Sequence, residues 1–307
     1  MRLVVLGSAA GGRVPQWNCG CSNCCQVRAG SSQILPRTQD SVVIGRDGRW
    51  VLCNVSPDVA SQIDACRHLH PRGSRHSPIA AIILTNGDVD HVVGLLSLRE
   101  SYPLVVYATA AVWHGLSERN VLFQTLQRFD GHTTWRQLHL GDSLAIADAD
   151  GCDLGLSVTA EAIPGKRPLH LEIGSSTSPS PEDNVGLFVC GDGERVAYIP
   201  GARAVAPVDA LLHKHRTQCL LFDGTFWRDD ELQSLGLGTA RALDMAHQPI
   251  SGDGGSMHAF ANPNLRRIYT HINNTNPILR EDSVERRAVV DSGWEVAHDG
   301  MEIELHS

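Results

Sequence analysis

A short apolar run that ends in a polar turn, residues 79–91 with the sequence IAAIILTNGDVDH, constrains this chain more than any other stretch. Ile79–Leu84 is aliphatic and is typical of a buried strand. Because such a strand fixes the direction of the loop behind it, Asp88, Asp90 and His91 can converge on one metal ion. The stretch therefore predicts a metal site at the end of a strand.

The same turn has a second interpretation. Asp and Asn are frequent in turns and at helix N-caps, so Asn86 and Asp88 could simply lead into a helix near His91. Asp88 could also join the metal as a further ligand, or orient His91 through a hydrogen bond. The sequence leaves these alternatives open.

The composition of the 307-residue chain argues against several classes of protein. A formal charge of −8 argues against nucleic-acid binding, which needs clustered Lys and Arg for phosphate contacts. No apolar segment reaches the length of a membrane span, and the N-terminal run is too short for a signal peptide. We therefore expect a cytoplasmic protein without a membrane span, and its apolar fraction of 42% is ample for a core.

Short β-type runs alternate with helical patterns, which predicts an α/β fold. Strands are expected at Arg2–Leu6, Val42–Ile44, Trp50–Val55, Ile79–Leu84, Leu104–Tyr107, Leu154–Ala160, Val185–Val189, Arg195–Ile199, Cys219–Phe222, Arg267–Tyr269 and Trp294–Ala297. Helices are expected at Val59–His68, Val92–Arg99, Thr109–Leu116, Pro207–His215, Thr239–Met245 and Ser283–Val290. No long linker divides the chain, and Gly174–Asp183 is expected to be a loop, so we predict a single domain over residues 1–307.

Four cysteines cluster in the stretch NCGCSNCCQ, where Cys19, Cys21 and Cys24 form a CxCxxC pattern next to Cys25. Three thiolates this close in a polar turn can occupy three corners of a tetrahedral zinc site, which would stabilise the loop without catalysis. A redox-active or oxidation-prone cluster is the alternative. We expect a structural zinc ion in the loop 19–25, with its fourth ligand from elsewhere in the chain.

The turn after the strand resembles the HxHxDH motif of the metallo-β-lactamase superfamily. Only Asp90 and His91 match this motif, because Asn86 and Asp88 stand in place of its two leading histidines. The resemblance therefore implies a modified metal site rather than a copy of the hydrolase centre.

Two further segments depart from the superfamily pattern. The superfamily takes a third histidine from the middle of the chain, and the matching segment Ala162–Pro168, AIPGKRP, has none. It also takes a metal-bridging aspartate after a strand like VAYIPGA, where this chain has Pro200 and Gly201. A hydrolytic centre with two zinc ions cannot be assembled from these residues.

The segment YTHINNTNP at Tyr269–Pro277 follows another predicted strand. In related lactamase-fold phosphodiesterases with the same CxCxxC pattern, an HxxH pair here gives one histidine to the active site and the next to zinc. In this chain the pair reads His271 and Asn274, so the resemblance implies an active-site role for His271. It leaves Asn274 or Cys25 as the fourth zinc ligand.

Asp90, His91 and His271 remain as ligands of the active-site metal. Two imidazoles and one carboxylate that leave coordination positions open are the set used by non-haem Fe(II) oxygenases, in which substrate and O2 bind at the vacant face. The remaining ligands therefore indicate oxidation rather than hydrolysis.

The strings LTNGDVDHVVGL, AIPGKRP, FDGTFWRDDEL, AHQPISGDGGSM, YTHINNTNPIL, HDGMEIEL and CGCSNC resemble the family of pyrroloquinoline quinone (PQQ) biosynthesis protein B and spread from residue 19 to residue 305. The resemblance implies the metallo-β-lactamase fold, a four-layer αβ/βα sandwich with two mixed β-sheets. It also implies Fe(II)- and O2-dependent hydroxylation of the tyrosine ring in a cross-linked Glu-Tyr precursor. The implied iron ligands are Asp90, His91 and His271, and the implied ligands of structural Zn(II) are Cys19, Cys21 and Cys24.

Such a substrate carries several carboxylates and amino groups, so its site needs hydrogen-bond donors. Lys166, His247 and Ser251 are the candidates, together with the backbone N–H groups of the glycine loop 252–255, for which an ordinary turn is the alternative. Asp223 could bond to a metal-binding histidine or simply end its strand.

Two other functions are compatible with the chain: a carrier that binds finished PQQ for transport or release, and a metal-dependent hydrolase of the same fold. The expected partners are the small-molecule precursor and O2. A homodimer and contacts with other PQQ biosynthesis enzymes are left open.

Overall fold

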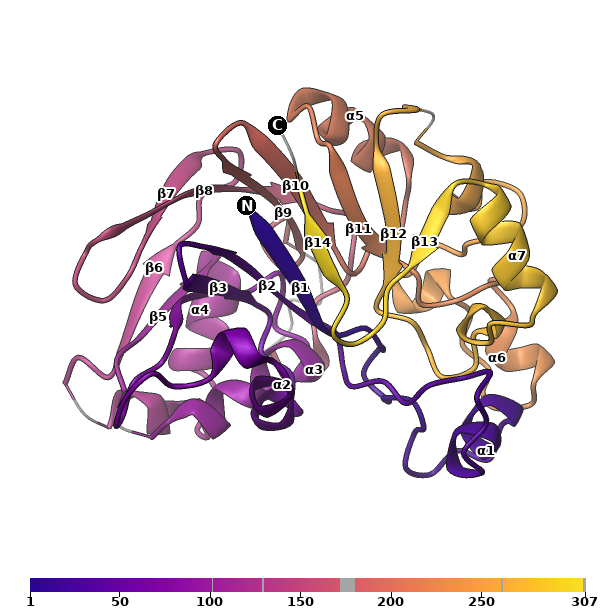
Figure 1. The fold of residues 1–307 in the computed structure, drawn as a ribbon, viewed down its shortest axis with the longest axis horizontal. Helices are drawn as coiled ribbons and strands as arrows, with labels where there is room; N and C mark the ends of the chain where they lie inside the picture. Colours follow the sequence, from indigo (N-terminus) through magenta and orange to yellow (C-terminus); the bar gives the residue numbers. More distant parts are fainter. Residues whose placement is uncertain (101, 129, 172–179, 261, 306–307) are drawn as a thin grey trace.

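The computed structural model describes residues 1–100, 102–128, 130–171, 180–260 and 262–305. Of the predicted loop Gly174–Asp183, residues 174–179 lie outside the described residues. Two seven-stranded sheets form the centre of the molecule (Figure 1). This mixture of sheets and helices confirms the predicted α/β fold.

The first sheet is mixed, with the strand order β14-β1-β2-β3-β4-β5-β6. Neighbouring strands from β14 to β3 are antiparallel, and those from β3 to β6 are parallel. The strands are β1 (Arg2–Gly7), β2 (Ser41–Arg46), β3 (Arg49–Cys53), β4 (Ile79–Ile83), β5 (Leu104–Ala108), β6 (Thr133–Gln137) and β14 (Glu302–Glu304).

The second sheet repeats this arrangement, with the order β13-β12-β11-β10-β9-β8-β7. Strands β7 to β10 pair antiparallel, and β10 to β13 pair parallel. The strands are β7 (Ser143–Ala147), β8 (Asp153–Ala162), β9 (Val185–Gly191), β10 (Glu194–Ile199), β11 (Cys219–Asp223), β12 (Arg266–Thr270) and β13 (Trp294–Val296).

The helices are short. The α-helices are α1 (Ser22–Arg28), α2 (Val59–Ala65), α3 (Val89–Val92), α4 (Ala110–Ser117), α5 (Ala206–Lys214), α6 (Glu231–Ser234) and α7 (Val284–Asp291). The 3-10 helices are η1 (Arg67–Leu69), η2 (Val93–Leu98), η3 (Phe123–Gln127), η4 (Leu169–Leu171), η5 (Leu243–Met245), η6 (Ser256–His258) and η7 (Pro277–Leu279). In the part of the chain that is described, none of the helices has the length and apolar character needed to cross a membrane.

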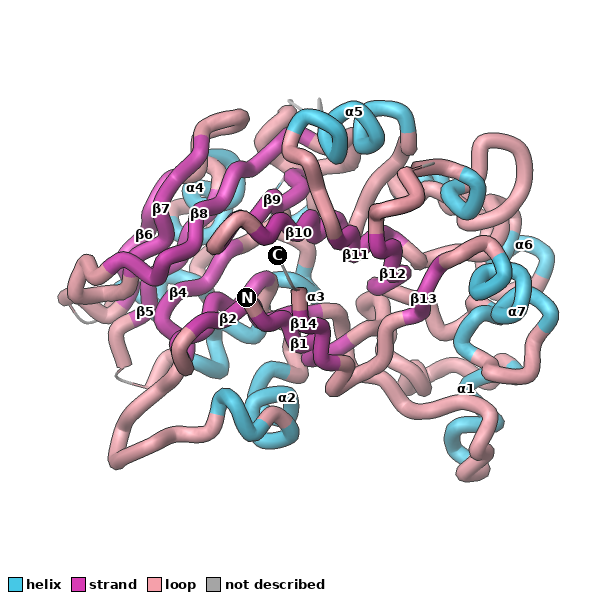
Figure 2. Tube along the Cα trace, turned by 45° about the horizontal axis from the view of Figure 1, so that its top comes forward, coloured by secondary structure: helices cyan, strands magenta, loops and turns pink. Residues whose placement is uncertain are grey.

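Three clusters of buried apolar side chains define the layers. One cluster lies between the sheets and joins residues of both, such as Val5 and Leu221. A second packs the outer face of the first sheet against α2 and α4, and a third packs the second sheet against α5 and α7. Figure 2 shows the two rows of strands with α2 outside one and α5 outside the other. The predicted four-layer sandwich with two mixed sheets is confirmed.

The sequence did not predict strands β6, β7 and β14. All three are edge strands. Their side chains are largely half-buried or exposed, so they lack the apolar run that marks the central strands. The short helices α1 and α6 were not predicted either.

Two predicted helices are only partly present. Instead of an α-helix over Val92–Arg99, η2 follows α3, because the N–H of Gly94 donates to the carbonyl of Val55 and leaves the helical pattern. Of Thr239–Met245 only η5 is helical. There Asp229 accepts the backbone N–H groups of Ala242 and Leu243, which an α-helix would need.

Backbone contacts join the two sheets beside the ends of β4 and β12. The loop after β1 pairs with the residue that follows His271, through a bridge between Ala9 and Ile272. Asn86, after β4, forms a bridge with Asn184, just before β9. Polar side chains that follow strands of opposite sheets therefore lie together at one edge of the sandwich, which we call its mouth.

Candidate metal centre

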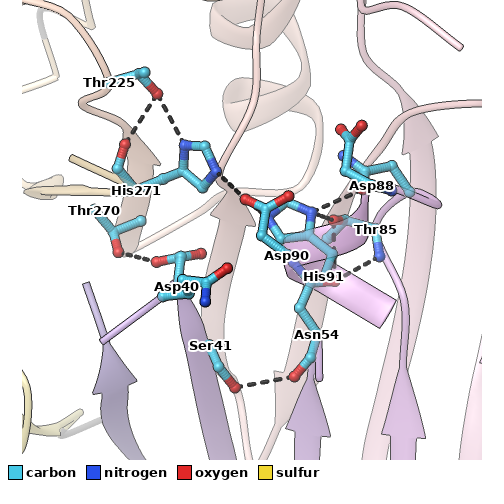
Figure 3. Close-up of polar contacts among 12 residues, drawn as sticks. Asp40, Ser41, Asn54, Thr85, Asp88, Asp90, His91, Thr225, Thr270 and His271 are labelled. Atoms are coloured by element: carbon cyan, nitrogen blue, oxygen red, sulfur yellow. Dashed lines mark hydrogen bonds and ion pairs between the residues drawn. The ribbon is translucent and has the colours of Figure 1, made fainter. Parts of the chain in front are cut away.

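Asp90, His91 and His271 lie together at this mouth (Figure 3). Asp90 and His91 belong to α3, which follows the turn after β4, whereas His271 follows β12 of the other sheet. His271 Nε2 is 3.2 Å from Asp90 Oδ2, and His91 Nε2 is 3.8 Å from the same oxygen. One ligand atom from each residue lies within 4.8 Å of the others, so the three side chains can reach one ion.

Backbone contacts hold α3 in place. The N–H of Val55 donates to the carbonyl of His91 at 2.7 Å, and the N–H of Gly94 donates to the carbonyl of Val55 at 3.0 Å. Gly94 has no space for a side chain, because a Cβ there would lie 2.1 Å from the carbonyl oxygen of Ser56. The loop after β3 thus fixes the position of His91.

His271 has a left-handed backbone with a φ of 54°. A residue other than glycine in this region costs roughly 1–3 kcal/mol, which the surrounding structure must offset. The N–H of Ile272 donates to the carbonyl of Ser8, and the N–H of Ala10 donates to the carbonyl of Ile272, both at 2.9 Å. These bonds hold the backbone on both sides of the imidazole.

Both imidazoles direct Nε2 toward Asp90. His91 Nδ1 is 2.7 Å from Asn86 Oδ1, and His271 Nδ1 is 2.8 Å from Thr225 Oγ1. His91 Nε2 is buried and makes no hydrogen bond within the described residues. A buried nitrogen with a free lone pair beside a carboxylate and a second imidazole is the environment that a divalent metal needs, so these residues fit a metal ion.

The electrostatics of the metal-free site favour an ion pair. Burial alone would raise the pKa of Asp90, but the neighbouring His91 ring and the hydrogen bond from His271 outweigh it and hold that pKa well below its usual range. Burial opposes protonation of His271, yet the hydrogen bond to Asp90 and the carboxylates Asp40 and Asp223 raise its pKa to about 9. A divalent ion would take the place of this proton between the ring and the carboxylate.

Asp40 is a buried acid of this site that sequence reasoning missed. Figure 3 shows its carboxylate below His271 and Asp90. It accepts hydrogen bonds from the hydroxyl groups of Thr270 and Tyr198, and its burial raises its pKa. In the sequence Asp40 is a single acid before a strand, which is indistinguishable from an ordinary turn residue.

A cavity of about 240 Å³ opens in front of Asp90, His91 and His271. Asp88, Lys166 and His247, which are candidates from the sequence, line this cavity, and their roles stay predictions. The remaining lining residues, besides the three ligands, are Ala10, Gly11, Asn86, Gly165, Asn184, Gly201, Thr225, Phe226, Met245, Ala246 and Asn273. Among the described lining residues Lys166 is the only lysine or arginine, and it is exposed.

Ser251 is not brought to this cavity. Its hydroxyl donates to the carbonyl of Trp227 at 2.7 Å, so its donor is already used, and neither it nor the glycine loop 252–255 lines the cavity. The predicted donor role of this segment is corrected because the loop folds back on Trp227 and on itself, as the bond from the N–H of Gly255 to the carbonyl of Gly252 shows.

Asp223 forms a pair with His247, with Oδ2 2.8 Å from the ring Nδ1. Burial would raise the pKa of Asp223, but the charge and hydrogen bond of His247 lower it. Asp223 also accepts from the hydroxyl of Thr225 at 2.6 Å, and that hydroxyl is the partner of His271. From the sequence, Asp223 could either bond to a metal-binding histidine or simply end its strand. In the structure its carboxylate contacts His247 directly and is linked to His271 through the hydroxyl of Thr225.

The three thiols of the CxCxxC pattern gather around the side chain of Asn274. Their sulfur atoms lie within 4.8 Å of one another. The amide nitrogen of Asn274 lies 3.2 Å from Cys19 Sγ and 3.4 Å from Cys24 Sγ, with Cys21 Sγ at 3.6 Å. The exposed Cys25 instead donates to the carbonyl of Gly20 at 3.3 Å. The side chain of Asn274 therefore lies beside the three thiols, and Cys25 faces elsewhere.

Comparison with known proteins places the chain in a family. Residues 49–272 match the beta-lactamase superfamily domain. A coenzyme PQQ synthesis protein B of Methylobacterium sp. (strain 4-46) is 46% identical over 309 residues, which cover 99% of this chain and all 100% of that protein. The corresponding protein of Ruegeria pomeroyi is 44% identical over 308 residues, with coverages of 99% and 100%.

Solved structures agree with this relationship. The crystal structure of Zn(2+)-bound PqqB from Methylobacterium extorquens has a TM-score of 0.91 at 44% identity and covers 99% of this chain and 100% of that one. A diphosphatase from the PhnP family, at 19% identity, has a TM-score of 0.67, covers 99% and 98% of the two chains, and shares the fold. The predicted metallo-β-lactamase fold is confirmed, and the chain belongs to the coenzyme PQQ synthesis protein B family.

Proposed function

We propose that this protein acts in PQQ biosynthesis as an Fe(II)- and O2-dependent hydroxylase of the tyrosine ring in a cross-linked Glu-Tyr precursor. The observation that carries the proposal is the convergence of one carboxylate and two imidazoles, from both sheets, beside a cavity. Two histidines and one carboxylate suit Fe(II) and leave coordination positions for a substrate and O2.

Asp90, His91 and His271 would hold the ion, and the cavity wall would place the substrate. Phe226 and Met245 offer apolar surface for an aromatic ring. Lys166 offers an ammonium group for a carboxylate of the precursor. When bound, iron would supply the O2 activation that ring hydroxylation needs. The protein would contribute position and exclusion of water.

The overall reaction has a definite balance. One oxygen atom of O2 replaces a ring hydrogen as a hydroxyl group, and the other leaves as water. Two electrons and two protons are therefore required from an external two-electron reductant, which an assay can supply as ascorbate.

The test is an assay of protein loaded with Fe(II) under anaerobic conditions and then given the cross-linked Glu-Tyr compound, ascorbate and O2. The expected product carries one added oxygen atom derived from isotopically labelled O2, identified by mass. Asp90→Ala and His91→Ala should lose both Fe(II) binding and turnover. Full turnover by these variants would disprove the site, and tight binding of PQQ without O2 consumption would favour a carrier instead.

Lys166 has its own test. Lys166→Ala should raise KM for the precursor while the Fe(II) content stays unchanged, because the side chain lines the cavity without being placed among the ligand atoms. An unchanged KM would remove Lys166 from the substrate site.

We also propose that Cys19, Cys21 and Cys24 hold a structural Zn(II), with Asn274 completing the site once its amide turns so that the oxygen replaces the nitrogen that now faces the sulfur atoms. The support is the clustering of the three sulfur atoms around that side chain. Metal analysis of the freshly purified protein should give one zinc that Cys24→Ala removes and Cys25→Ala retains. A zinc content unaffected by Cys24→Ala would exclude this site.

A further inference from the structure

Asn86 and Asn184 form a buried amide pair between the two sheets, at the back of the candidate metal centre. Their side chains belong to residues that are 4% and 6% exposed, and Asn86 Nδ2 donates to Asn184 Oδ1 at 3.2 Å. Neither residue was assigned a role as a ligand or a substrate-binding group above. Both line the cavity, so their contacts bear directly on it.

The contacts of Asn184 fix which way its amide points. Asn184 Nδ2 donates to the carbonyls of Ile163 at 3.2 Å and Gly201 at 3.0 Å. Because carbonyl oxygens only accept, the nitrogen must face them and the oxygen must face Asn86. Gly165 allows this position, since a Cβ there would lie 2.7 Å from Asn184 Nδ2. Asn184 can therefore serve Asn86 only as an acceptor.

The orientation of Asn86 follows from that of Asn184. Its Nδ2 is used on Asn184, so its Oδ1 faces the other way, where it accepts the N–H of Asp88 at 3.0 Å and lies 2.7 Å from His91 Nδ1. The bond from the N–H of Asp88 confirms the orientation independently, because a backbone N–H only donates. His91 Nδ1 must then carry the proton, and Nε2 keeps its lone pair.

The free lone pair of His91 is on Nε2, the ring nitrogen that faces Asp90. His91 Nε2 is buried, has no hydrogen bond within the described part of the chain, and is 3.8 Å from Asp90 Oδ2. The hydrogen bonds that run from the carbonyls of Ile163 and Gly201 through the two asparagine amides end at His91 Nδ1, and each has only one permitted direction. This chain of hydrogen bonds through Asn184 and Asn86, the asparagine relay, permits one neutral tautomer of His91. In that tautomer Nδ1 carries the proton and Nε2 can bind a metal.

We propose that Asn86 is a positioning residue that, with Asn184 behind it, fixes His91 in the Nδ1–H tautomer and presents Nε2 to the metal. The inference deepens the proposed function, because it rests on Asp90, His91 and His271 as the ligand set. It gives Asn86, at the place of the first histidine of HxHxDH, the task of orienting a ligand instead of being one.

The first test needs no variant. Heteronuclear NMR of the ring nitrogens in the metal-free protein, at a pH above the titration range of free histidine, distinguishes the two tautomers of His91. The signals of His91 are assigned by their loss in His91→Gln. The expected spectrum shows a protonated Nδ1 and an unprotonated Nε2. A protonated Nε2 would overturn the proposal.

The second test measures how the asparagine relay affects metal binding. Asn86→Ala removes the acceptor at 2.7 Å and leaves Thr85 Oγ1 at 3.5 Å from His91 Nδ1. His91 should therefore populate both tautomers, and the Kd for Co(II) at the active site should rise about 10–100-fold. Asn86→Asp keeps an oxygen opposite His91 Nδ1 in either protonation state, so it should keep the Nδ1–H tautomer and stay well below that loss. Unchanged Co(II) affinity and tautomer in Asn86→Ala would refute the role.

Gln62→Ala is the matched control. Gln62 is a buried amide with hydrogen bonds to Thr38 and to the carbonyl of Gln39, and it does not line the cavity. Its loss should lower stability without changing the His91 tautomer or the Co(II) affinity. If Asn86→Ala does not fold, the spectrum of the unaltered protein still decides the question. Since no readout uses turnover, a protein that meets these expectations but does not hydroxylate would overturn only the proposed function.

Discussion

At the scale of single residues, the orientation of each imidazole in the candidate metal centre depends on the hydrogen-bond partner of its Nδ1 atom. Neutral acceptors hold both rings: Asn86 Oδ1 faces His91, and Thr225 Oγ1 faces His271. A carboxylate in these places would make the ring a stronger donor to the metal. With neutral acceptors, the only negative charge among the three predicted ligands is that of Asp90.

Thr225→Val tests the support of His271. The hydroxyl of Thr225 donates to Asp223 Oδ1 at 2.6 Å and accepts from His271 Nδ1, 2.8 Å away. Valine keeps the shape and removes this bond, so we expect the Kd for Co(II) at the active site to rise about 10–100-fold. Titration followed by visible absorption measures this, with Thr225→Ser as the control. Equal affinity of the two variants would contradict the prediction.

Sequence reasoning could place only part of this residue network. Asp90 and His91 were predictable because they are adjacent and directly follow a strand, and His271 because it follows another strand in a polar segment. Asn184 and Thr225 were not, because each is one polar residue beside a strand. Their roles depend on which segments become neighbours. This is decided by the bridge that joins Asn86, after β4, to Asn184, before β9 of the other sheet, and by the pairing of β11 with β12.

At the scale of elements, the segment from α3 to η2 carries two of the proposed metal ligands, and one glycine fixes its position. Gly94→Ala would bring a Cβ to 2.1 Å from the carbonyl oxygen of Ser56. We expect a loss of about 1–3 kcal/mol in the free energy of unfolding and weaker metal binding, because α3 must move away from the loop after β3. Denaturant unfolding and Co(II) titration measure both effects.

Gly73→Ala is the control for this substitution. A Cβ at Gly73 would meet no atom of the described residues within 4 Å, so its effect should stay within about 0.5 kcal/mol. If Gly94→Ala were as stable as Gly73→Ala, the backbone contact at Ser56 would not be what fixes α3.

A buried acid on α6 predicts how stability depends on pH. Burial, opposed by hydrogen bonds from Thr275 and the N–H of Trp227, raises the pKa of Glu231 from 4.5 to about 7. Between these values the folded protein keeps a proton that the unfolded chain has lost, so stability falls as pH rises through this range. The full loss is about 3 kcal/mol.

Glu231→Gln should remove this dependence. The amide oxygen can still accept the N–H of Trp227, and no charge develops when the pH rises. We expect the variant to be more stable than the unaltered protein above pH 7 and to lack its decline from pH 4.5 to 7, measured by denaturant unfolding. A variant with the same decline would show that another group causes it.

At the scale of the whole molecule, the arrangement of elements explains why the fold was more predictable than its edges. The central strands are aliphatic and buried, so their pattern alone predicts an α/β fold. The edge strands β6, β7 and β14 form only because a sheet is already there to pair with. The order of strands, and hence the meeting of Asp90 with His271, has no local signal.

The thiol cluster and the candidate metal centre are connected through the loop that begins at His271, so we expect a change at one site to affect the other. Asn274 contacts the thiols of Cys19 and Cys24, and Asn23 of α1 donates to the carbonyls of Asn274 and Asn276 at 3.0 Å each. Cys24→Ala should lose the structural metal and about 4 kcal/mol or more of unfolding free energy. It should also weaken Co(II) binding at the active site, because His271 begins the same loop.

Cys25→Ala is the matched control, since Cys25 is exposed and faces away from the cluster. It should leave both unfolding and Co(II) affinity near those of the unaltered protein. Loss of the structural metal in Cys24→Ala with an unchanged Co(II) affinity would show that the two sites are independent.

Four consecutive residues, from His271 to Asn274, join the imidazole of one site to the amide of the other. Oxidation of the thiols, at a partly exposed turn, would release Asn274 and with it the strained backbone of His271. Under oxidant stress the protein would therefore lose its capacity to hold a catalytic ion while every residue that binds that ion remained chemically intact.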